Sequence, residues 1–196
     1  MAFLRVLGVD PALRNFGLVR ARIDLASLET PELVWDVEDM DVIKTANESG
    51  KTVRKSSDDL RRAMEMHKGF HGMAKGCALI FAEIPSGSQS ARANISAGMS
   101  IGVLASSPVP IVQVQPIEAK KKTVGRATAT KDEMIDWATA RFPNAPWRRR
   151  KFRGKWELLG ENEHMADGCA IIKAGLETDQ FLQVASMYHA AIARAA

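Results

Sequence analysis

The sequence predicts an α/β protein in which helices flank a mixed sheet of five strands, three antiparallel and then two parallel. Two observations predict this fold. Three strand-like segments joined by short connections open the chain, and helical and strand-like segments alternate from Ser57 onward. Short connections favour antiparallel neighbours, whereas a helix between two strands allows them to run parallel. The 196 residues, of which 46% are hydrophobic, predict one domain spanning residues 1–196.

The first three strands are predicted from their apolar patterns. Phe3 to Asp10 is almost continuously apolar, as expected of a central strand, and ends in a carboxylate followed by proline. Gly17 to Leu25 alternates between apolar and polar positions. A third segment runs from Leu33 to Ile43, so the three strands form a meander. The polar stretch from Ala46 to Lys55 is predicted to be a loop.

Helices and strands then alternate. Apolar residues at helical spacing predict a helix from Ser57 to Ala74, before the stop at Gly76. A short buried strand, Ala78 to Glu83, again ends in a carboxylate. The remaining elements are a helix at Ser90–Ser106, a strand at Ile111–Val114, and helices at Lys131–Phe142, at Glu163–Ala174 behind Asn162 as a cap, and at Gln180–Ala195. This order of elements is that of the ribonuclease H-like fold.

Composition gives weaker indications. The net charge of +4 favours a polyanionic partner only modestly. Cys77 and Cys169 both lie in apolar stretches, which is typical of small buried residues in a reducing compartment. Because no apolar run approaches the roughly 20 residues of a membrane span and the start does not resemble a signal peptide, we expect a cytoplasmic protein without a membrane partner.

Three acids stand where this fold brings distant residues together. Asp10 ends the first strand, Glu83 ends the fourth, and Asp167 lies near the start of a late helix. Carboxylates gathered without basic partners repel one another, so divalent cations best explain such a cluster. Oxygen ligands favour Mg²⁺, with Mn²⁺ as an alternative. Two such ions can promote hydrolysis of a phosphodiester, which predicts a nuclease.

His164 extends the acidic cluster. The i, i+3 spacing of His164 and Asp167 places both side chains on one helix face, where the imidazole can ligate metal or accept a proton. Glu161 and Glu163 are alternative ligands. Taken singly, an acid at a strand end is more often a turn former or cap, and a histidine at this place is usually a polar helix start. The joint placement favours the site.

A basic, aromatic segment, WRRRKFRGKW, predicts a DNA-binding loop in which cations meet phosphates and aromatic rings stack on unpaired bases. The alternative is a solvated basic surface on which the two tryptophans are packing anchors. The residues of this candidate DNA contact are Trp147, Arg148, Arg149, Arg150, Lys151, Phe152, Arg153, Lys155 and Trp156.

Three motifs resemble those of the RuvC family of Holliday-junction resolvases. LGVDPALRNFGLV is similar to its opening motif, with Asp10 as the catalytic aspartate and Gly17 opening the second strand. FAEIPSGSQSARANISAGMSIGVLA resembles the motif in which a strand-ending glutamate, here Glu83, precedes a helix of small residues. HMADGCAIIKAG resembles the terminal acidic motif, with Asp167 as the aspartate and His164 where members carry Asp or His.

The stretch AKKKTVGRATATKDEM resembles the family's basic region, where lysines contact DNA near the active site. Arg14, in the turn after the first strand, can reach a phosphate, although a plain turn role is equally compatible. The matching lysines are Lys120, Lys121, Lys122 and Lys131, of which the first three depend on the alignment and the last can also belong to a helix surface.

Two departures from the family pattern point to a diverged, bacteriophage-type member from a bacterial or phage-infected host cell. The segment IPSGSQSARAN is shorter than its bacterial counterpart and lacks the aromatic wedge that many members place near the crossover. Asn144 to Glu157 stands as an insertion.

The resemblance implies a magnesium-dependent endonuclease that resolves Holliday junctions during DNA recombination and repair, with two ions per active site. A homodimer is expected because a four-way junction presents two strands of like polarity, and Gly98 and Gly102 permit a close contact either with the sheet or with a second subunit. The alternatives are a broader fork or flap nuclease and a non-catalytic junction-binding protein. Whether a branch-migration motor is a partner is left open.

Overall fold

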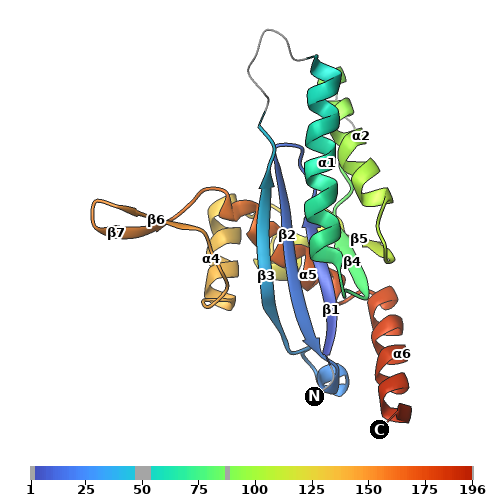
Figure 1. Ribbon diagram of the computed structural model, residues 1–196. Helices are drawn as coiled ribbons and strands as arrows, with labels where there is room; N and C mark the ends of the chain where they lie inside the picture. The colour runs from blue at the N-terminus through green and yellow to red at the C-terminus, as the bar shows by residue number, and fades with distance from the viewer. Residues whose placement is uncertain (1–2, 47–53, 87–88, 196) are drawn as a thin grey trace.

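A five-stranded mixed sheet forms the centre of the computed structural model, which describes residues 3–46, 54–86 and 89–195 (Figure 1). β1 pairs antiparallel with β2 and parallel with β4; β2 also pairs antiparallel with β3, and β4 pairs parallel with β5. The predicted mixed sheet is therefore confirmed, whereas most of the predicted loop between Ala46 and Lys55 lies outside the described residues. In spatial order the strands are β3 (Trp35–Lys44), β2 (Asn15–Asp24), β1 (Phe3–Asp10), β4 (Leu79–Ala82) and β5 (Ile111–Gln113).

Burial explains why the central strands are so apolar. Val6, Leu7 and Val9 of β1 are fully buried, and all four residues of β4 are buried as well. Alternate residues of a strand point to opposite faces, so a strand covered by helices on both sides must be apolar at consecutive positions.

Helices cover both faces of the sheet (Figure 1). One face packs against α1 (Lys55–Ala74) and α2 (Ala91–Ala105). The other packs against α3 (Pro116–Thr123), α4 (Lys131–Arg141) and α5 (Asn162–Gly175). A short 3-10 helix, η1 (Leu25–Glu29), joins β2 to β3, and α6 (Asp179–Ala195) ends the chain. Within the described ranges, none of these helices has the length and apolarity required to cross a bilayer.

The predicted helices and strands agree with the observed bounds to within two residues at nearly every end, but three local features differ. The sequence interpretation missed α3, and the segment predicted as a loop contains a hairpin of β6 (Arg149–Phe152) and β7 (Lys155–Leu158). Asn162 does not cap α5. Its buried side chain instead makes two hydrogen bonds to the backbone of Arg148. The segment before the helix folds back, so the N–H and carbonyl of Arg148 lie beside Asn162.

α5 lies in backbone contact with the two central antiparallel strands. A Cβ atom at Gly8 of β1 would stand 2.3 Å from the carbonyl oxygen of Gly168, and one at Gly17 of β2 would stand 2.5 Å from that of His164. Only glycine permits this approach. The N-terminal half of α5 is thereby held against the end of β1.

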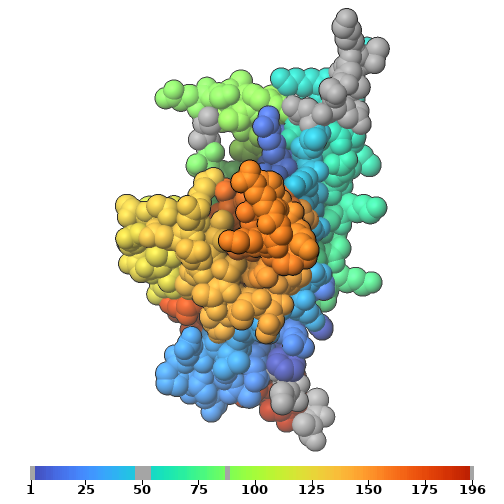
Figure 2. Space-filling model, turned by 90° about the vertical axis from the view of Figure 1, so that its left-hand side faces the viewer, coloured from blue at the N-terminus to red at the C-terminus, as the bar shows by residue number. Residues whose placement is uncertain are grey.

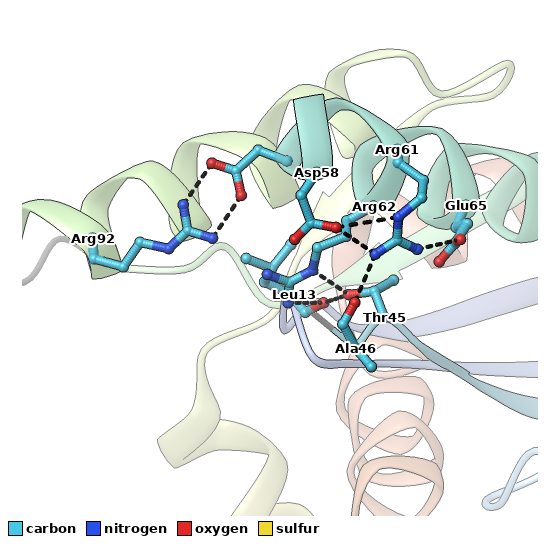
Figure 3. A network of polar contacts seen from close by, with 9 residues as sticks. Leu13, Thr45, Ala46, Asp58, Arg61, Arg62, Glu65 and Arg92 are labelled. Atoms are coloured by element: carbon cyan, nitrogen blue, oxygen red, sulfur yellow. Dashed lines mark hydrogen bonds and ion pairs between the residues drawn. The ribbon is translucent and has the colours of Figure 1, made fainter. Parts of the chain in front are cut away.

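A buried arginine fixes the turn that follows β1 (Figure 3). Arg62 of α1 is 2% exposed, and its guanidinium donates to the Thr45 hydroxyl at 3.0 Å and to the Leu13 carbonyl. The Thr45 hydroxyl also donates to the Leu13 carbonyl. Near the start of α1, Asp59 accepts two hydrogen bonds from Arg92 of α2, at 2.5 and 2.6 Å. These contacts tie both helices of this face to the loop immediately after Asp10.

We expect Gly8→Ala to lower the free energy of unfolding by about 1–3 kcal/mol, because the added methyl group overlaps a backbone oxygen that cannot rotate away. Gly72→Ala is the matched control, since no atom lies within 4 Å of its added methyl group and alanine favours a helix by about 1 kcal/mol over glycine. Urea denaturation monitored by circular dichroism measures both. Equal stability of the Gly8→Ala variant and the wild type would contradict the close packing of α5.

Candidate active site

The sheet topology brings the first two acids together. Asp10 is the last residue of β1, and Glu83 directly follows β4. These strands are parallel neighbours, with Val9 opposite Ala82, and the amide of Glu83 donates to the carbonyl of Val9 at 3.4 Å. The carboxyl ends of adjacent parallel strands lie at one edge of the sheet, where open α/β sheets place their binding sites.

α5 supplies the other two members from its first turns. His164 Nδ1 lies 2.7 Å from Asp10 Oδ2, within hydrogen-bonding distance, although 154 positions separate the residues. Both side chains are mostly buried, at 16% and 17% exposure. The hydrogen bond to Asp10 raises the pKa of His164, while burial opposes that shift. The Asp10 carboxylate therefore stabilises the charged form of the imidazole.

Asp167 and Glu83 complete a negatively charged cluster. Burial, followed by the negative charge of Asp10, raises the pKa of Asp167 to about 7. The same two causes raise the pKa of Glu83, and the positive charge of Lys120 opposes part of that rise. An acid whose pKa rises because of another acid is close enough to feel its charge. The four residues predicted from the sequence thus converge, and their carboxylates lack full compensation.

Divalent cations fit this donor set in type and charge. Carboxylate oxygens suit Mg²⁺, and a cation would relieve the repulsion that raises the pKa values of Asp167 and Glu83. The geometry is not ready-made: among residues 3–46, 54–86 and 89–195, no three histidine, cysteine or acidic side chains form a group that could hold a metal as placed. Asp10 would have to share its carboxylate between His164 and a cation. The two-ion magnesium site remains a prediction.

The two alternative ligands have other partners. Glu161 is 10% exposed and pairs with Lys44 and with Arg148. Glu163 accepts from Lys131 at 2.5 Å and also helps to raise the pKa values of His164 and Asp167. Glu161 therefore belongs to an ion-pair network beside the site, whereas Glu163 contributes to the field of the site itself.

The predicted basic residues divide by position. Lys120 and Lys131 lie near enough to the acids to affect pKa values there or to be affected by them. Arg14 is exposed in the turn after β1, and Lys121 is exposed on α3. Lys122 pairs instead with Glu177, which follows the C-terminal end of α5. The 14 residues of α5 span about 20 Å, so this ion pair lies at the other end of the helix from His164, and the contact of Lys122 with DNA stays a prediction.

The two residues before the hairpin, Trp147 and Arg148, differ in surroundings from the hairpin itself. Trp147 is 6% exposed, and its indole N–H donates to the Phe142 carbonyl at 2.8 Å, so it anchors the segment in the core and is not available to stack on bases. The guanidinium of Arg148 pairs with Glu161 and Asp41, and its contact with a DNA phosphate stays a prediction. The predicted contact residues that remain exposed are Arg149, Arg150, Lys151, Phe152, Arg153, Lys155 and Trp156.

Comparison with known proteins supports the fold. No family model and no curated protein sequence matches the chain. The structure resembles that of Thermus thermophilus RuvC, with a TM-score of 0.59 and 16% sequence identity over 87% of this chain and 92% of that chain. It resembles T. thermophilus RuvC in complex with Holliday junction substrate to the same TM-score, with 15% identity and the same coverage. The ribonuclease H-like fold predicted from the element order is confirmed.

In metal-free protein, the partly buried Asp167 should reduce stability at high pH. Its folded pKa of about 7 exceeds its ordinary value of 3.8, so the folded state binds more protons between these values and stability falls as the pH rises through them. Asp167→Asn removes the charge. We expect it to raise the free energy of unfolding at pH 8 by on the order of 2–4 kcal/mol, and by little at pH 4. The measurement is urea denaturation in EDTA.

The exposed Asp136 provides the control, because Asp136→Asn makes the same chemical change on the surface of α4. A gain for Asp167→Asn that does not depend on pH would contradict the assigned burial and charge.

The histidine offers an independent check. Asp10→Asn should lower the pKa of His164 toward its ordinary value of 6.5, because the amide cannot stabilise the imidazolium as the carboxylate does. NMR titration of the His164 ring protons in metal-free protein measures the shift, with His189 as an internal reference. An unchanged titration would show that the hydrogen bond between Asp10 and His164 does not form in solution.

Proposed function

We propose that this chain is a metal-dependent endonuclease of the RuvC type, which resolves Holliday junctions by paired phosphodiester hydrolysis during DNA recombination and repair. The observation that carries the proposal is the convergence of Asp10, Glu83, His164 and Asp167 at one sheet edge, in a fold that RuvC shares. The likeness to RuvC in complex with Holliday junction substrate supports a four-way junction as the substrate. The bacterial or phage-infected cytoplasm is the corresponding site of action.

The acids and the histidine have separate roles in this mechanism. Asp10, Glu83 and Asp167 would hold Mg²⁺ or Mn²⁺, and such ions, when bound, activate water and stabilise charge on the phosphate and its leaving oxygen. The Nδ1 atom of His164 faces Asp10, which leaves Nε2 to accept a proton from the attacking water. Water's oxygen bonds to phosphorus, the bond to the 3'-oxygen breaks, and the leaving 3'-oxygen takes up a proton from solvent, giving 5'-phosphate and 3'-hydroxyl ends.

Basic residues around the acids would position the DNA backbone. Lys120 and Lys131 are close to the cluster, and Arg14 lies on the turn that Arg62 fixes. Cations at these places would attract the phosphates on either side of the one that is cut. They would also reduce the repulsion between the acids of the site and the DNA. The exposed part of the hairpin adds a second basic surface beside them.

We infer that the chain forms a homodimer through α1 and α2. A groove of about 880 Å³ lies between these helices, and its lining is largely apolar. Leu60 and Met64 stand one turn apart on its α1 side at 62% and 63% exposure. No atom lies within 4 Å of a Cβ built at Gly98 or Gly102, so these glycines do not contact the sheet and that alternative is wrong. The other alternative, a contact with a second subunit, is the one we propose. A second copy matches the need for two symmetric cuts.

The junction assay tests the nuclease proposal directly. We expect the protein to cut four-way junctions in Mg²⁺ but not in EDTA, and to cut forks, flaps and linear duplex more slowly. Asp167→Asn should bind junctions with unchanged affinity yet cut them on the order of 10³-fold or more slowly, because a charged ligand is lost from the reacting centre. Denaturing gels at nucleotide resolution measure both cutting and end chemistry.

Asp136→Asn should cut at the wild-type rate. Equal cutting of forks and junctions would favour a broader branched-DNA nuclease, and binding without any cutting would favour a junction-binding protein. Normal cutting by Asp167→Asn would show that the site assignment is wrong.

The dimer is tested by placing a charge in the groove. Met64→Asp should convert a dimer to a monomer in light scattering after gel filtration, since an unpaired carboxylate is costly to bury between subunits. Met187→Asp is the control, because Met187 is 72% exposed on α6, away from the groove. A wild-type monomer, or a Met64→Asp dimer of wild-type stability, would contradict this interface.

A further inference from the structure

The hairpin of β6 and β7, residues 149–158, is called the arm here because it projects from the body of the molecule (Figure 1). All eight strand residues are exposed. Figure 2 looks at the side from which the arm projects: the arm (orange) stands at the front, beside the region of α3 and α4 (yellow) and below the turn after β1 (blue). The arm therefore lies beside the edge of the sheet that carries the acids.

The turn at the tip sets how the two strands of the arm pair. Arg153 and Gly154 both have positive φ, at 47° and 81°, which is the pattern of a two-residue turn whose twist matches that of the strands. Arginine is uncommon in this left-handed region, so its backbone is held there by the strand pairing on either side. A short turn of this kind fixes the register, with Phe152 opposite Lys155 and Lys151 opposite Trp156.

The tip presents aromatic rings among cations. Phe152 is 45% exposed and Trp156 is 67% exposed. Because directly opposed residues share a face of a hairpin, these two rings lie on opposite faces. The guanidinium carbons of Arg150 and Arg153 lie 5.4 and 5.2 Å from the centre of the Phe152 ring. Neither ring contributes to a core cluster, so folding does not explain them.

The base of the arm is joined to the start of α5 by a clamp made of Arg148 and Asn162. Asn162 is fully buried, and its side chain accepts from the Arg148 amide at 2.9 Å and donates to the Arg148 carbonyl at 2.8 Å. The Arg148 guanidinium pairs with Glu161, one residue earlier. His164 follows two residues after Asn162, in the same first turn of the helix. The position of the arm is thus set relative to the site by a buried contact.

We propose that the arm is a base-stacking element that engages the branch point of the DNA, and that the clamp fixes the distance from the branch point to the cut. This inference rests on the proposed nuclease function. Five cations on the arm, against the one acidic residue Glu157, would bind the backbone of any DNA. Two exposed rings on opposite faces add a preference for branched over linear DNA, because aromatic side chains stack on bases that are unpaired or can be separated. Base pairs at a branch point are the ones that open most easily.

Base stacking is measured without cutting. Asp167→Asn protein is mixed with a fixed junction that carries 2-aminopurine beside the branch point, and fluorescence reports unstacking of that base. We expect a rise in fluorescence that is lost when Phe152→Ala and Trp156→Ala are added, together with at least about fivefold weaker junction binding. Affinity for linear duplex should change less than twofold.

Phe3→Ala is the matched control, because Phe3 is 44% exposed and has the guanidinium carbon of Arg22 at 5.2 Å, yet lies at the start of β1. Unchanged fluorescence in the double arm variant, or an equal loss of affinity for linear duplex, would overturn the proposal.

The clamp is tested by where the wild-type active site cuts. Asn162→Ala should bind and unstack the junction but spread its cuts over several nucleotides, whereas the wild-type protein cuts at one position relative to the branch. Arg148→Met keeps the backbone hydrogen bonds to Asn162 and removes the ion pairs, so it should spread the cuts less. It replaces Asn162→Ala as the test if that variant does not fold. A single unchanged cut position in both would overturn the role of the clamp. A wild-type protein that cuts none of the DNAs would refute the nuclease function, and the fluorescence assay would still decide whether the arm stacks on bases.

Discussion

The backbone contact between α5 and the two central antiparallel strands is the constraint on which the candidate site depends. Where Gly8 and Gly17 meet Gly168 and His164, any side chain larger than hydrogen would push the helix away from the sheet. At that closeness, the first turn of α5 places an imidazole 2.7 Å from the carboxylate that ends β1. If α5 moved away from the sheet by about an ångström, His164 and Asp10 would stand in the same elements but beyond hydrogen-bonding distance.

Close packing also creates an electrostatic difficulty. Asp167 is held partly buried near Asp10 and Glu83, and burial together with these negative charges raises its pKa to about 7. His164 offsets one negative charge, and Lys120 offsets part of another. The remaining charge is unfavourable for folding, and a cation, if bound as proposed, would offset it.

The sequence is sufficient to predict the parts of the site that follow from strand ends and helix periodicity. Asp10 and Glu83 each follow a short apolar run and precede proline by at most two positions, and His164 and Asp167 share a helix face. Residues whose roles depend on distant partners could not be placed in this way. Trp147 looks like its exposed neighbour Trp156, and only the Phe142 carbonyl and the core distinguish them.

The same limit applies to Lys122 and Asn162, whose partners lie elsewhere along the chain. The hairpin has a local signal in the sequence, since Arg153 and Gly154 separate two pairing segments, but charged residues obscure the usual alternation of apolar and polar positions. Gly8 gave no signal at all, because a glycine in a buried strand shows a need for space only once the crossing helix is in place.

The exposure of every strand residue in β6 and β7 has a consequence for substitutions. Since these positions belong to neither hydrophobic cluster, substitutions there should cost folding little. On the proposed function, a few surface substitutions on the arm would therefore change the shape of branch that it engages while the packing of the glycines and acids beneath stayed the same.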